Sequence, residues 1–102
     1  MDIELTRGHP ETLEEIVKKL EEEGYEEIFV WKDHPNSEYP WHAHPHDEVR
    51  WILEGSVLIC TETEEITLKS GDRLDLKANT RHRATTGEEG VSYVCGSKIR
   101  RL

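Results

Sequence analysis

The stretch YPWHAHPHDEVRWILEG, residues 39–55, decides how the rest of the sequence is interpreted. It places His42 and His44 two residues apart and Glu48 four residues further on. Side chains at i and i+2 of a β-strand point to the same face, so the two imidazoles can converge on one point and the carboxylate can join them. Such ligands suit a divalent transition metal, and His82 is the candidate for the fourth ligand. The stretch therefore predicts a metal site formed by these four residues.

A surface cluster of histidines is the alternative interpretation. The sequence contains six histidines, so a close pair can arise by chance. The order of the residues nevertheless favours a built site, because the pair is followed by Glu48, by Gly55, and then by a Gly-Asp turn, a strand and His82. We expect the two remaining histidines of this region, His34 and His46, to be loop residues and not ligands.

The same residues resemble the two sequence motifs of the cupins. The first motif, G-x5-H-x-H-x3,4-E-x6-G, aligns with Asn36, His42, His44, Glu48 and Gly55. The second motif, G-x5-P-x-G-x2-H-x3-N, aligns with Gly71, Lys77, Asn79, His82 and Thr86. The resemblance covers roughly residues 26–99, and it includes all four metal-ligand positions.

The departures from these motifs leave the ligand positions intact. Asn replaces Gly at Asn36 and Asn79, and Asn is the non-glycine residue that best tolerates the left-handed backbone conformation. Both turns are therefore expected to form. Lys77 replaces a proline and Thr86 replaces an asparagine, and neither position is a metal ligand.

Short apolar segments separated by turn residues predict a β-structure after residue 25. The expected strands are 27–33, 39–44, 48–54, 56–62, 66–69, 73–77, 81–86 and 91–99. Short strands at this spacing indicate an antiparallel sandwich or jelly roll. The resemblance implies the cupin version of that fold, an all-β double-stranded β-helix barrel, here with one N-terminal α-helix.

The N-terminal part of the chain contains the predicted helix, residues 10–23. Thr12 and Glu15 can form a capping box, and Gly24 is expected to end the helix. The stripe Leu13, Ile16, Val17 and Leu20 follows helical spacing and is expected to pack against the barrel or against a partner subunit. We expect a single domain in which residues 1–25 form a helical extension and residues 26–102 form the barrel.

The composition excludes several classes of partner. The net charge is −9, with 22 acidic and 13 basic residues, which disfavours nucleic acid. No apolar stretch is long enough to cross a bilayer and no signal pattern opens the sequence, so a cytoplasmic protein without a membrane partner is the expectation. Cys60 and Cys95 are expected to be reduced and buried.

The run HAHPHDEVRWILEG also resembles the corresponding run of acireductone dioxygenases, cupins that use iron or nickel. In those enzymes an arginine two residues after the glutamate ligand holds the substrate, and Arg50 occupies this position. The resemblance implies that Arg50 orients a substrate. The alternative is that Arg50 pairs with a carboxylate such as Asp75, because an inward charge needs a partner.

Three functions follow from these observations and remain open. The leading one is a metal-dependent oxygenase that acts on a small anionic or enediol-like molecule and uses iron, manganese or nickel. The alternatives are a Lewis-acid sugar isomerase or epimerase, for which zinc is a further option, and a non-catalytic module that binds a small ligand. Cupins host all three, so the fold does not choose among them. We also expect a homodimer, because a partner can cover sheet edges and the apolar helix stripe.

Overall fold

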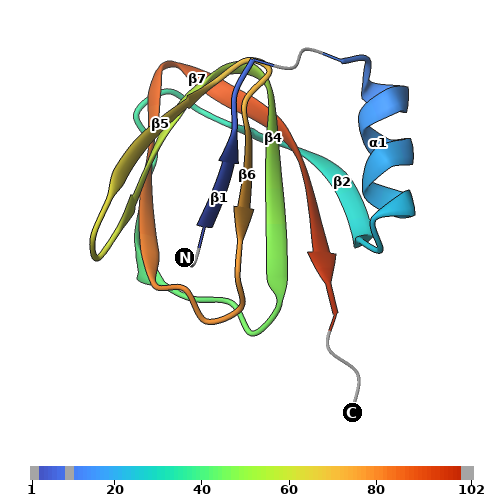
Figure 1. The fold of residues 1–102 in the computed structure, drawn as a ribbon. Helices are drawn as coiled ribbons and strands as arrows, with labels where there is room; N and C mark the ends of the chain where they lie inside the picture. The colour runs from blue at the N-terminus through green and yellow to red at the C-terminus, as the bar shows by residue number, and fades with distance from the viewer. Residues whose placement is uncertain (1–2, 9–10, 100–102) are drawn as a thin grey trace.

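The structure is a computed structural model that describes residues 3–8 and 11–99 (Figure 1). It contains one helix and seven strands in these residues: β1 (Ile3–Thr6), α1 (Leu13–Glu22), β2 (Glu26–Asp33), β3 (Glu38–His42), β4 (Asp47–Thr61), β5 (Glu65–Lys69), β6 (Arg73–Leu76) and β7 (His82–Lys98). All of the strand pairs are antiparallel. The prediction of an all-β fold with one α-helix is confirmed.

The two longest strands, β4 and β7, each contribute to both layers of the barrel. Residues 47–55 of β4 pair with residues 91–98 of β7 in the first layer, whose strand order is β1-β6-β4-β7-β2. Residues 57–61 pair with residues 82–86 in the second layer, which β5 and β3 extend on either side. Figure 1 shows the long strands curving between the layers.

Glycine permits the bend of β4. Gly55 has a φ of +76°, and a Cβ atom at this position would lie 2.1 Å from the carbonyl oxygen of Gly90 in β7. The sequence analysis placed a break between two strands at Gly55 and another at residues 87–90. Both predictions were wrong, because β4 and β7 continue through these positions with irregular register and a change of direction. The glycines at these positions bend the strands and do not end them.

The main core lies between the two layers. Its buried members are Ile3, Ile52, Val57, Ile59, Leu68, Leu74, Leu76 and Val91. Ile3 belongs to β1, a strand that the sequence analysis did not predict, because four residues are too few to establish an alternating pattern. Strand β1 pairs with β6 and places Ile3 opposite Leu76. The division of the chain at residues 25 and 26 remains a prediction.

Helix α1 packs on the outer face of the first layer. Thr12 is its N-cap and forms the predicted capping box with Glu15, whereas residue 10, the predicted start, lies outside the described residues. The helix stops before Gly24, which has a φ of +94°. Ile16 and Leu20 are buried in a second core. The apolar stripe therefore packs mainly against the barrel of the same chain.

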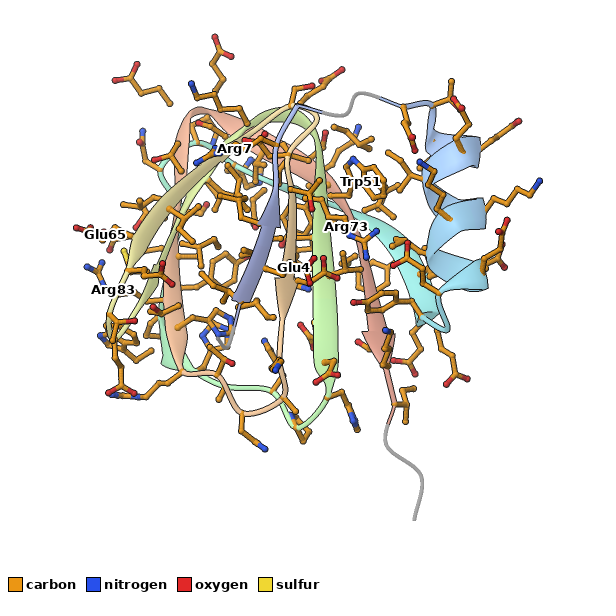
Figure 2. The ribbon with its side chains drawn as sticks, viewed as in Figure 1. Glu4, Arg7, Trp51, Glu65, Arg73 and Arg83 are labelled. Atoms are coloured by element: carbon orange, nitrogen blue, oxygen red, sulfur yellow. The ribbon has the colours of Figure 1, made fainter. Side chains whose placement is uncertain are left out.

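Trp51 and Arg73 lie at this junction between helix and sheet (Figure 2). Trp51 is buried in the second core, and the Arg73 guanidinium lies 5.3 Å from its ring. Arg73 also pairs with Glu23, next to the helix, and with Asp75 on β6. These contacts fasten α1 to the barrel. No helix in the described part of the chain is long and apolar enough to cross a membrane.

Candidate metal centre

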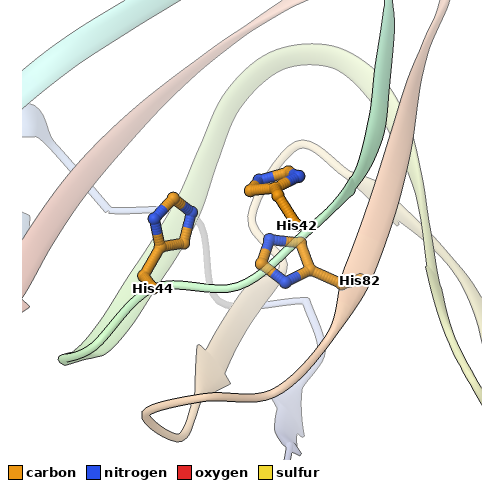
Figure 3. A group of neighbouring side chains, drawn as sticks. All are labelled: His42, His44 and His82. Atoms are coloured by element: carbon orange, nitrogen blue, oxygen red, sulfur yellow. The ribbon is translucent and has the colours of Figure 1, made fainter.

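Three histidines from two segments of the chain meet between the layers (Figure 3). One potential ligand atom from each of His42, His44 and His82 lies within 4.8 Å of the others. His42 ends β3 and is the register partner of His82, the first residue of β7. His44 follows β3 and lies in the loop before β4. The expectation that one strand carries both His42 and His44 was therefore wrong, although the predicted convergence of the three rings is present.

A backbone hydrogen bond positions the loop that carries His44. The carbonyl oxygen of His44 accepts from the backbone N–H of Asn79, with 2.7 Å between the heavy atoms. Asn79 has a φ of +65° and Asn36 has a φ of +56°, as expected from asparagine at these two motif positions. The left-handed turn at Asn79 thus helps to bring the two sequence motifs together.

Backbone carbonyls orient two of the three rings. The Nδ1 atom of His42 lies 2.6 Å from the carbonyl oxygen of Pro40, and Nδ1 of His82 lies 2.9 Å from that of Thr80. A carbonyl oxygen can only accept, so each Nδ1 carries the proton and each Nε2 keeps a lone pair. Histidines that bind metals are commonly held in this way.

The third ring has a buried nitrogen for which the described residues provide no hydrogen-bond partner. Nε2 of His44 forms no hydrogen bond in the described part of the chain and is inaccessible to solvent. An unpaired buried polar group costs about 1–3 kcal/mol. Burial lowers the pKa of His44, and Arg50 and His42 lower it further, whereas Glu48 acts in the opposite direction. Burial likewise lowers the pKa of His82. These shifts favour the neutral forms of His44 and His82, which are the forms that bind metal. The close approach of ligand atoms from all three histidines also fits a metal ion.

Glu48 lies beside this cluster. One carboxylate oxygen is 3.7 Å from Nδ1 of His44, and the other accepts a hydrogen bond from Arg50 at 2.7 Å. Its role as the fourth ligand remains a prediction. The carboxylate partner of Arg50 is thus Glu48 and not Asp75, which pairs with Arg73.

A cavity of about 300 Å³ adjoins the histidines. Its lining comes from both layers: Phe29, Trp31, Asp33, Tyr39, His42, His44, Arg50, Val57, Ile59, Leu76, His82, Ala84, Thr86, Val91, Tyr93 and Cys95. Arg50, Ala84 and Thr86 belong to this lining and lie at alternate positions along their strands from Glu48 and His82. Burial raises the pKa of Tyr93 to about 12, so its hydroxyl is neutral beside Arg50. Most of the surface that these residues present to the cavity is apolar.

The sequence analysis missed Asp33 and Tyr39, which are polar residues of this lining. The signal available was the alternation of Phe29, Trp31 and Asp33 along β2, which places these three side chains on one face. The contact of Asp33 with Tyr39 depends on the turn between β2 and β3, which periodicity does not describe. His34 and His46 do not line the cavity, as expected for loop residues.

A more open groove of about 630 Å³ lies elsewhere on the barrel and includes Tyr25, Arg73 and Asp75. Its lining contains no histidine among the described residues, and Arg73 and Tyr25 both bind Asp75. These groups satisfy one another and link β6 to the segment after α1. The histidine-lined cavity is therefore the candidate functional site.

Comparison with solved structures identifies similar folds. A cupin-2 domain protein from Shewanella frigidimarina is 25% identical with a TM-score of 0.60, and the match covers 71% of this chain and 68% of that chain. A DUF861 family protein from Thermotoga maritima is 23% identical with a TM-score of 0.66, covering 91% of this chain and 96% of that one. KdgF from Halomonas sp. is 21% identical with a TM-score of 0.61, covering 72% and 69%. No curated protein matches the sequence.

The sequence itself provides the family assignment. The family model described as a cupin domain matches residues 29–96, which include the three histidines and nearly the whole barrel. This match agrees with the antiparallel two-layer topology and with the position of the histidine cluster between the layers. The chain therefore belongs to the cupin family.

Proposed function

We propose that this protein is a metal-dependent cupin that acts on a small molecule in the histidine-lined cavity. His42, His44 and His82 would hold one divalent transition metal, with Glu48 as the fourth ligand. The observation that carries the proposal is the buried, unpartnered Nε2 of His44 within a cluster whose other two rings are held by backbone carbonyls. Nitrogen and oxygen ligands of this kind suit iron, manganese or nickel, and zinc is the alternative.

Oxygenase chemistry on an anionic or enediol-like substrate is the reaction that we propose. The bound metal would supply Lewis acidity and, if it is iron or nickel, redox chemistry. The residues of the chain would bind and orient the substrate. Arg50 lines the cavity and pairs with Glu48, its one ion-pair partner among the described residues, so a substrate anion would find a guanidinium near the histidines. The apolar residues Val57, Ile59 and Leu76 would exclude water from this end.

Two other functions use the same cavity. A Lewis-acid isomerase or epimerase requires a metal but no oxygen, and a binding module requires neither turnover nor a vacant metal position. The acireductone-dioxygenase-like run favours the oxygenase, because Arg50 lies where that resemblance places a substrate-binding arginine.

A free coordination position on the bound metal would distinguish the oxygenase from the binding module, because oxygen must bind there. The metal-free protein would be loaded anaerobically with Fe(II) and then exposed to nitric oxide, which binds only where a coordination position is free. We expect the electron paramagnetic resonance signal of an Fe(II)–nitric oxide complex. Its absence at full iron loading would contradict the oxygenase proposal. A positive signal followed by oxygen uptake with enediol-like compounds would support turnover over binding alone.

We also propose that the protein is a homodimer. Ile16 and Leu20 of the helix stripe are buried within the chain, so the edges of the sheet are the remaining reason for association. Strand β2 is the end of its layer in the described residues, and Val30, which does not line the cavity, is exposed on it. Light scattering at micromolar concentration should give the mass of a dimer, and the mass of a monomer would contradict it.

A further inference from the structure

The side of the cavity formed by β2 differs from the histidine side. Phe29, Trp31 and Asp33 alternate along β2, and their register partners on β7 are Cys95, Tyr93 and Val91. All six line the same cavity. The β2 side of the cavity therefore presents aromatic rings and a carboxylate, whereas the opposite layer presents the histidines.

Asp33 organises the aromatic side chains around it. The hydroxyl of Tyr39 donates to the carboxylate at 2.7 Å, and the indole N–H of Trp31 donates to it at 2.8 Å. Both donors are uncharged, and Asp33 forms no ion pair within the part of the chain that the structure describes. A carboxylate offers about four lone-pair positions, so these two donors leave room for a further one. The negative charge of Asp33 is thus fixed in place without a cation.

The rings next to Asp33 lack the cations that the other aromatic side chains have. Each of the other described aromatic residues, Tyr25, Trp41, Trp51 and Tyr93, has an arginine or lysine of this chain over its ring. No such contact is present for Phe29, Trp31 or Tyr39 in residues 3–8 and 11–99. Phe29 and Trp31 remain 51% and 43% exposed, with ring centroids 6.4 Å apart in an edge-to-face arrangement.

Aromatic faces next to a carboxylate form a recognised environment for organic cations. The negative face of a ring attracts an ammonium group by about 0.5–2 kcal/mol, depending on how far the site is desolvated. A carboxylate held between such rings adds a charge at short range. The cluster offers both, and no arginine or lysine of residues 3–8 and 11–99 pairs with Asp33 or lies over these rings.

We infer that the ligand of this cavity carries an ammonium group, which Asp33 binds beside the rings of Phe29, Trp31 and Tyr39. The ammonium group defines the class of ligand for the proposed function. Only the placement of the rest of the ligand near the histidines rests on that function. Arg50 lines the same cavity, so a zwitterionic molecule could place its carboxylate or other anion at Arg50 and its ammonium group at Asp33.

Choline and its uncharged isostere 3,3-dimethylbutan-1-ol test the inference directly. The two have nearly the same shape, so a difference in binding reports the charge. Titration calorimetry would be done on the full chain after chelation of metal, so that the result does not depend on the metal site. We expect saturable binding of one choline per chain, with the isostere at least ten times weaker. The Asp33→Asn variant should also bind choline at least ten times more weakly.

The matched control is Glu38→Gln, which removes one negative charge from an exposed position on β3. Its affinity for choline should equal that of wild type. The His82→Ala variant should also retain choline binding, because loss of this metal ligand leaves Asp33 and its hydrogen bonds unchanged. This variant separates failure of the proposed function from failure of the inference.

Four results would overturn the inference. They are absence of choline binding by wild type, equal affinity for choline and its isostere, unchanged affinity in Asp33→Asn, and a dimer in which a second copy covers Phe29 and Trp31 and blocks choline. If Asp33→Asn does not fold, as judged by circular dichroism, the comparison of choline with the isostere on wild type decides alone. Trp31→Leu, which retains the carboxylate, should weaken choline binding and not abolish it.

Discussion

Glu48 accepts a hydrogen bond from Arg50 at 2.7 Å on the same face of β4, and its second carboxylate oxygen lies 3.7 Å from His44. The carboxylate thus lies between a guanidinium and the histidine cluster. Burial acts to lower the pKa of Arg50, but the charge and hydrogen bond of Glu48 together with Tyr93 and Cys95 outweigh it, and the pKa is raised. A metal held by the histidines would compete with Arg50 for this carboxylate.

Removal of Arg50 should therefore strengthen metal binding. In Arg50→Leu the carboxylate is released and a nearby positive charge is lost, so we expect roughly tenfold tighter binding of Ni(II), the size of effect typical of residues that support metal ligands. The metal-free variant should unfold more easily, by about 1–3 kcal/mol, because Glu48 loses its charged partner. Titration calorimetry and urea unfolding measure the two effects. Weaker Ni(II) binding would contradict the competition, and Arg83→Leu, on the outer face, is the control.

The same arginine should anchor anions. Small carboxylates such as oxalate should raise the melting temperature of the wild-type protein, because a ligand that binds only the folded state stabilises it. Arg50→Leu should lose this response and still bind metal. The measurement is thermal unfolding of the metal-free proteins over a series of oxalate concentrations. Equal shifts in both proteins would place the anion elsewhere.

Asp72 should make the protein sensitive to acid. Its carboxylate accepts from Arg7 at 2.9 Å and from the backbone N–H groups of Gly8 and Lys69 at 3.0 and 2.9 Å. Burial acts to raise the pKa of Asp72, but these bonds outweigh it and the pKa is lowered. Because the pKa of Asp72 is lower in the folded state than in the unfolded state, the ionised carboxylate stabilises the protein at pH values above the unfolded pKa of about 3.9. This stabilisation is lost as the pH falls through the folded-state pKa.

The Asp72→Asn variant tests this sign. At pH 7 it should lose about 1–3 kcal/mol of unfolding free energy, because the ion pair with Arg7 and part of the hydrogen bonding are removed. The difference from wild type should shrink as the pH is lowered from 6 to 3. Urea unfolding at each pH measures it, with Glu89→Gln on the exposed surface as control. A difference that grows in acid would contradict the assignment.

The bend in β4 should not tolerate a side chain. Gly55→Ala would place a Cβ atom 2.1 Å from the Gly90 carbonyl oxygen at a positive φ. We expect a loss of about 2–4 kcal/mol from strain and overlap together. Gly24→Ala is the matched control: Gly24 also has a positive φ, but a Cβ there has open space, so about 1–2 kcal/mol of strain is expected. Similar losses in the two variants by urea unfolding would show that the close approach to Gly90 is unimportant.

The sequence predicted the parts of the site that depend on residue type and spacing. The convergence of His42, His44 and His82, the capping of α1 by Thr12 and the left-handed turns at Asn36 and Asn79 could all be anticipated, because each follows from local chemistry. The family motifs supplied the pairing of distant segments that periodicity alone does not give.

Other features depend on contacts that no local pattern encodes. The continuity of β4 through Gly55 follows from its packing against Gly90, which lies in another strand. The pairing of Glu48 with Arg50 in place of Asp75 follows from which face of the sheet each residue occupies. The hydrogen bond from Tyr39 to Asp33 depends on the turn that connects β2 to β3.

The central claim is that the three histidines hold one metal ion, and metal content measures it most directly. Wild type, His82→Ala and the control His34→Ala would be loaded with Fe(II), Mn(II), Ni(II) or Zn(II) in turn, passed over a desalting column and assayed for metal per chain. We predict one ion per chain in wild type and in His34→Ala, and its loss in His82→Ala. A wild type that retains none of these metals, or a His82→Ala variant that retains a full equivalent, would contradict the metal centre.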